Sequence, residues 1–153
     1  MRQFIDIINE THDYNPEWDY EVVDEPEHAK EIVEAVKARV HAELMPRLGM
    51  SGMKVFFAAD LDGALARYVY GTSSFPVLGV DFAALTRACE EHELEVEQQL
   101  AATIAHELAH AYQERIGTLN DDEDHDEDGV EDEAETFARR WVMDGVVDVS
   151  ILE

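Results

Sequence analysis

One segment, residues 95–116, constrains the fold of this chain more than any other. Its apolar residues recur at the three- and four-residue spacing of an amphipathic helix: Leu100, Ile104, Leu108 and Ala111. Gly117 follows the segment, and glycine is a common residue at the C-terminal end of a helix. The segment therefore predicts a long helix that buries one face and carries His106 and His110 on another.

Other segments predict shorter elements around this helix. Apolar runs at residues 54–59, 66–71 and 76–82 indicate strands. Further helices are expected at residues 26–45, 83–92 and 131–143, with Asp81 as a cap and with Pro46 and Gly49 as a stop. The tail, 146–153, is expected to add a short strand.

A chain of 153 residues suits one domain with one core, here residues 1–153. We expect an N-terminal helical part, 1–50, and a core, 51–153. The order of the elements predicts an α+β fold, in which a small antiparallel or mixed sheet of about three strands packs on the long helix and the C-terminal helix.

Metal chemistry is indicated by the HELAH segment at residues 106–110. His106 and His110 are about one helical turn apart, so both imidazoles project from the same face and can share one ion. Glu107 lies about 100° round the helix from His106, where it can reach a metal-bound water without being a ligand. Zinc lowers the pKa of such a water toward about 7, and Glu107 can then take its proton as general base. Cys89 is the only cysteine, which excludes a cysteine-based zinc site.

The HELAH segment, together with the apolar strand PVLGVDF before it, resembles the zincin metallopeptidases over about residues 54–142. The resemblance implies a minimal zincin fold, with an active-site helix and a C-terminal helix that supplies a ligand. It also implies that the strand at 76–82 lies at the edge of the sheet beside the metal, where an extended substrate pairs with it.

A catalytic zinc site has three protein ligands and one open position for water. The segment EAETFA, which begins at Glu133, resembles the third-ligand segment of the gluzincins, especially the small ImmA/IrrE-type members, and this resemblance implies Glu133 as the third ligand. His125 is the alternative, because SprT-like peptidases follow their HExxH with a third histidine. Glu131 and Asp132 are candidates if the register differs.

The transition state also needs an electrophile, and the sequence does not choose among five candidates. These are Tyr68, Tyr70, His125, Arg139 and Arg140.

A second cation site is suggested by the spacing of acidic residues in 124–135, which matches an EF-hand calcium loop. The matching residues are Asp124, Asp126, Asp128, Gly129 and Glu135. Glu131 occupies a position that is normally aliphatic, and no helix is expected to lead into the loop. The alternative is a solvated acidic loop over 120–132, because so many carboxylates cannot be buried without partners.

The charge balance is unusual, with 36 acidic against 11 basic residues and a formal net charge of −25. Such a surface repels nucleic-acid phosphates and anionic membranes, so we expect no direct binding to either. No apolar run approaches the roughly 18 residues of a membrane helix, and the N-terminus has no signal-peptide pattern, which makes a cytoplasmic location the expectation. Abundant carboxylates with few lysines are typical of salt-adapted proteins, of a DNA mimic, or of an ordinary acidic protein.

These features together predict a zinc-dependent metallopeptidase that acts on a protein or peptide substrate with narrow specificity. The alternative is an acidic interaction protein, such as a DNA mimic or an inhibitor of a basic partner, in which the zinc site is structural or vestigial.

Overall fold

A computed structural model of the chain describes residues 22–24, 26–59, 61, 65–69, 76–116 and 127–152. Over these residues the fold is α+β, with five α-helices and a mixed sheet, and this confirms the predicted class. The strands are β1 (Val22–Val23), β2 (Lys54–Ala58), β3 (Ala66–Val69) and β4 (Val77–Val80). The α-helices are α1 (Lys30–Glu43), α2 (Met45–Leu48), α3 (Phe82–His92), α4 (Val96–Ile116) and α5 (Glu127–Asp144). Two short 3-10 helices are η1 (Glu27–Ala29) and η2 (Val149–Leu152).

The helix expected at 26–45 is divided into η1, α1 and α2. Pro46 lies in the first turn of α2, where its missing N–H costs nothing. Gly49 ends α2 with a φ of 70°, a conformation that glycine adopts without strain. Asp81 caps α3 as predicted, because its Oδ1 accepts a hydrogen bond of 3.0 Å from the Ala84 N–H.

The sheet has the strand order β1-β2-β4-β3, in which β2 and β4 run parallel and the other neighbours are antiparallel. The expectation that the strand at 76–82 forms the sheet edge is therefore wrong, because β4 lies between β2 and β3. Leu78 and Val80 in β4 are fully buried, as suits an internal strand. The edge strands are β1 and β3, and β3 carries the polar residues Arg67 and Tyr68.

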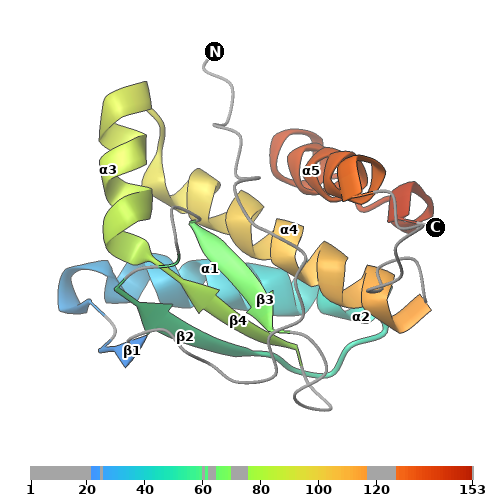
Figure 1. Cartoon of the computed structure of the whole chain (residues 1–153), viewed down its shortest axis with the longest axis horizontal. Coiled ribbons are helices and arrows are strands. Elements are labelled where there is room, and N and C mark those ends of the chain that lie inside the picture. The colour runs from blue at the N-terminus through green and yellow to red at the C-terminus, as the bar shows by residue number, and fades with distance from the viewer. Residues whose placement is uncertain are drawn as a thin grey trace.

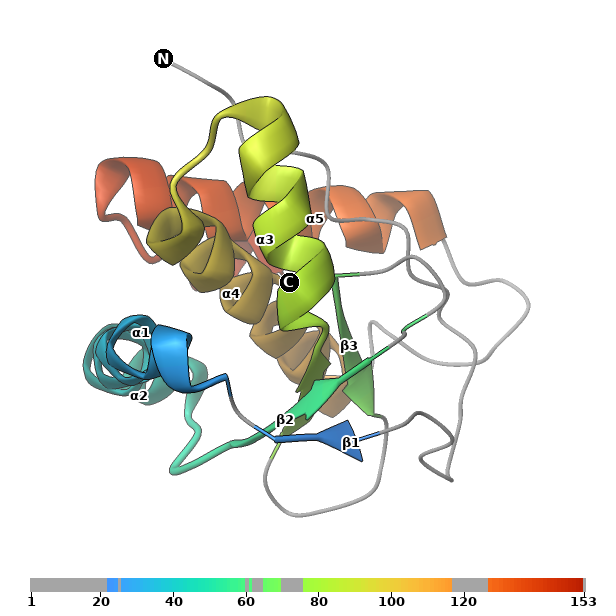
Figure 2. The ribbon, with the colours of Figure 1, turned by 90° about the vertical axis from the view of Figure 1, so that its left-hand side faces the viewer.

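The long helix α4 passes through the middle of the molecule. α1 and α4 lie behind the sheet in Figure 1, and α5 packs along α4; Figure 2 shows the same stacking from the side. Every residue of α4 from Gln99 to Ala111 is buried. The second face, which carries His106 and His110, is therefore buried as well, because α1, α3, α5 and β3 all pack against this helix.

The two longest helices, α4 and α5, both bury small side chains and pack against each other. Both helices bury alanines: Ala101, Ala105 and Ala109 on α4, and Ala134 and Ala138 on α5. Farther along α5, the fully buried Trp141 donates a hydrogen bond of 3.0 Å from Nε1 to Glu43 Oε1 at the end of α1. The guanidinium of Arg39 stacks 4.3 Å from the centroid of the Trp141 ring.

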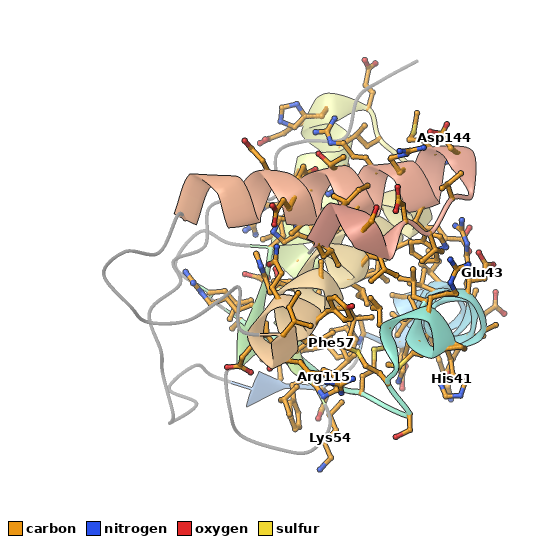
Figure 3. All side chains as sticks on the ribbon, turned by 90° about the vertical axis from the view of Figure 1, so that its right-hand side faces the viewer. His41, Glu43, Lys54, Phe57, Arg115 and Asp144 are labelled. Carbon is orange, nitrogen blue, oxygen red and sulfur yellow. The ribbon has the colours of Figure 1, made fainter. Side chains whose placement is uncertain are left out.

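The C-terminal end of α4 is fixed to α2. Figure 3 shows Arg115 at this end, and its Nη1 donates to the carbonyl oxygens of Leu48 at 3.2 Å and Gly49 at 2.9 Å. These bonds satisfy carbonyls that a short helix leaves without partners. The position of α4 is therefore set at both its buried centre and its exposed end.

Two expectations for the C-terminal part are corrected. The last helix begins at Glu127 rather than at 131, so residues 127–132 of the expected acidic loop are helical, and residues 120–126 lie outside the described ones. Acidic residues are favourable in the first turn of a helix, where they face the positive end of its dipole. The tail forms the 3-10 helix η2 instead of a strand, because Gly145 (φ 71°) reverses the chain and Leu152 is buried in the core. No helix of the described residues is long and apolar enough to cross a membrane.

Candidate metal centre

His106, Glu107 and His110 come together on α4, and one ligand atom from each lies within 4.8 Å of the others. The Nε2 atoms of the two histidines are 3.1 Å apart, and their rings are nearly perpendicular, at 83°. Two nitrogens that each bind a tetrahedral zinc at its usual distance stand about 3.3 Å apart. The histidine pair is therefore spaced like one edge of a zinc tetrahedron.

The other nitrogen of each histidine faces an oxygen. Gln113 Nε2 donates to Glu133 Oε1 at 3.2 Å, which leaves Gln113 Oε1 as an acceptor, so His110 Nδ1 donates to it at 2.8 Å. His106 Nδ1 lies 3.3 Å from Glu135 Oε2. The contact with Gln113 thus places the proton of His110 on Nδ1 and turns its Nε2 lone pair toward His106, which is the tautomer that a metal ligand needs.

Glu133, the predicted third ligand, takes part in this network but does not join the three-residue group. Its Oε1 accepts from Gln113, which in turn accepts from His110, so two hydrogen bonds separate the carboxylate from the histidine ring. Within the described part of the chain, no further acid comes close enough to join His106, Glu107 and His110. Ligation by Glu133 stays a prediction.

Glu135 contacts the opposite side of the site. Ala134 is buried between α5 and α4. Glu133 and Glu135 project about 100° to either side of Ala134 around the axis of α5, so they reach opposite sides of α4. Glu135 contacts His106, and Arg139 one turn later donates to Glu135 Oε1 at 2.8 Å. The guanidinium therefore helps to hold the carboxylate against the histidine.

The candidate electrophiles differ in position. Arg139 is paired with Glu135, and Arg140 lies 3.9 Å from Asp148 with nearly half of its side chain exposed. Tyr68 donates its hydroxyl proton to Glu114 Oε1. Burial, together with the hydrogen bond to Glu114 and its charge, raises the pKa of Tyr68, so the hydroxyl keeps its proton. Tyr70 and His125 lie outside the described residues.

Helical geometry shows which neighbour each side of the site faces. Glu107 and Glu114 are seven residues apart, so they project within about 20° of each other. Because Glu114 reaches Tyr68 on β3, Glu107 also projects toward β3. His106 reaches Glu135 on α5. The histidines thus line the α5 side and the predicted base lines the β3 side.

The calcium expectation involves loop residues that are partly outside the described ones, including Asp124 and Asp126. Asp128 and Gly129 belong to the regular helix α5, whereas the EF-hand spacing needs them in a loop with a sharp turn. Glu131 and Asp132, the candidates for a shifted register, also lie in α5. Glu135, the expected closing ligand, contacts His106 and Arg139.

Sequence reasoning missed Gln113 and Glu135 as partners of the histidines. Gln113 could have been found, because it follows His110 by three residues and projects from the same face of the helix. The same row begins earlier with the buried pair Gln99 and Thr103, joined by a bond of 3.3 Å. Glu135 carries no such local signal, since only the packing of α5 on α4 brings it to His106.

No protein-family model matches this chain, and neither does any curated protein or solved structure. The functional argument therefore rests on the chemistry of the site itself.

Proposed function

We propose that this protein is a zinc-dependent metallopeptidase that hydrolyses peptide bonds in a protein substrate with narrow specificity. The observation that carries the proposal is the pair of Nε2 atoms, 3.1 Å apart, with His110 Nδ1 hydrogen-bonded to Gln113 and His106 Nδ1 3.3 Å from Glu135 Oε2. Two imidazoles that turn their Nε2 atoms toward one point fit zinc, because each neutral ring can then supply one nitrogen ligand to the same ion.

Four residues of the chain have distinct roles in this proposal. His106 and His110 bind zinc, and Glu133 supplies the third ligand from the network that already joins it to His110. Bound zinc supplies a Lewis acid that lowers the pKa of a water toward about 7. Glu107, 1% exposed, accepts the proton of that water and later transfers it to the leaving amine.

The sheet supports a peptide as the substrate. β3 is an edge strand, and no other described strand pairs with its outer side. It packs against α4, and Figure 1 shows it alongside that helix. An extended peptide can pair with such an edge through backbone hydrogen bonds. Its carbonyls would then lie on the side of α4 toward which Glu107 projects.

Metal content and activity of matched variants test the proposal. The wild-type protein should bind one zinc, and Glu107→Gln should keep it while peptide hydrolysis falls by on the order of 10²–10³-fold. His110→Ala should lose the metal, whereas His92→Ala, an exposed histidine at the end of α3, should retain it. Purified wild-type protein that takes up no zinc would overturn the proposal.

A second candidate function is supported by the net charge of −25. An acidic interaction protein would bind a basic partner, and its function would survive Glu107→Gln. Loss of function on that single change would reject it.

A further inference from the structure

A second carboxylate lies on the side of α4 that turns toward β3. Glu114 follows His110 by four residues, or about 6 Å along the helix, and projects on the same side as Glu107. Its Oε1 accepts the hydrogen bond of Tyr68 on the edge strand. On the basis of the proposed function, we propose that Glu114 determines specificity by receiving a basic side chain of an extended peptide substrate.

Glu114 has capacity for such a cation. An ionised carboxylate can accept about four hydrogen bonds, and Tyr68 donates one. No lysine or arginine of the described residues forms an ion pair with Glu114. Its neighbour Arg115 is directed to the carbonyls of Leu48 and Gly49. The Glu114 side chain is only half-buried, so a ligand can reach it.

Tyr68 prepares this carboxylate for binding. Burial and the neighbouring Glu114 raise the pKa of the Tyr68 hydroxyl, so it remains a donor over the neutral pH range. The hydrogen bond fixes the carboxylate between α4 and β3. A carboxylate held in one orientation loses less conformational entropy when it binds a lysine or arginine side chain.

The position of Glu114 also fits the spacing of a bound peptide. In the proposed complex the peptide lies along β3 and α4 with its scissile bond level with His110. A strand rises about 3.4 Å per residue, so the roughly 6 Å from His110 to Glu114 corresponds to about two residues of the peptide. The net charge of −25 attracts cationic peptides before contact, while Glu114 selects the residue position. The expected preference for a lysine or arginine therefore depends on its position in the peptide and not only on the total charge of the peptide.

Peptide binding to zinc-loaded Glu107→Gln protein tests this inference without turnover. The probes are uncharged alanine–serine decapeptides with a fluorescent label, in which a single lysine is moved from position to position. We expect one lysine position to bind about tenfold more tightly than the uncharged peptide, as a local charge-assisted contact allows. Adding Glu114→Gln, which keeps an acceptor for Tyr68, should abolish that preference.

Glu97→Gln is the matched control, because it removes the same charge from the exposed first turn of α4. It should leave the lysine preference unchanged. Equal binding of lysine and neutral peptides by zinc-loaded protein, or equal effects of the two glutamate changes, would overturn the inference. Protein that takes up no zinc would instead overturn the proposed function, and the inference with it.

Discussion

The two polar sides of α4 differ in how firmly they are held. On the α5 side, His106 and His110 are 0% and 1% exposed, and each contacts an oxygen through Nδ1. On the β3 side, Glu114 and Tyr68 form a half-buried pair beside a sheet edge with which no other described strand pairs. Under the proposed function, the buried α5 side orients the metal ligands and the half-buried β3 side contacts the substrate.

The largest expected effect concerns Glu133. If it is the third zinc ligand, Glu133→Ala should weaken zinc binding by on the order of a thousandfold, as measured by competition with a chelator. His125→Ala should then have little effect. If the zinc affinity of Glu133→Ala fell by only about 10–100-fold, Glu133 would not be a ligand. It would instead orient His110 through its hydrogen bond to Gln113.

A smaller effect is expected at Glu135. Glu135→Gln removes the negative charge that faces His106 Nδ1 and should reduce zinc affinity by about 10–100-fold. Asp144→Asn removes one charge from the exposed end of the same helix and serves as the control. Equal zinc affinities of the two variants would show that the Glu135 contact does not orient the histidine.

The smallest effect is expected on the open side. Tyr68→Phe removes the hydrogen bond to Glu114 and should lower the free energy of unfolding by about 1 kcal/mol. Zinc affinity should remain that of the wild type, since the Tyr68 hydroxyl bonds to Glu114 on the β3 side of α4, away from the α5 side on which the histidines lie. A loss of zinc in this variant would contradict the separation of the two sides.

Local patterns predicted the local parts of this molecule well. The spacing in HELAH brings His106 and His110 to one face because a helix repeats every 3.6 residues. The cap at Asp81 likewise depends on its own turn. The order of the strands depends on which segments pair in three dimensions, so β4 could not be recognised as internal from its own residues.

The acidic segment before the C-terminal helix also shows that local patterns do not predict contacts between distant segments. A run of carboxylates favours a solvated loop, yet at the start of a helix the same charges are stabilising, and α5 begins at Glu127. The contact between Glu135 and His106 arises because α5 packs on α4. No spacing within either helix contains that information.

The packing of α5 has a consequence for local unfolding. Its C-terminal half is anchored by Phe137 and Trp141, whereas Ala134 buries only a methyl group between Glu133 and Glu135. Thermal opening should therefore begin at the end that carries the two carboxylates. Amide hydrogen exchange along α5 should decrease from its early turns toward Trp141, and a bound ion that joins both helices should flatten this gradient.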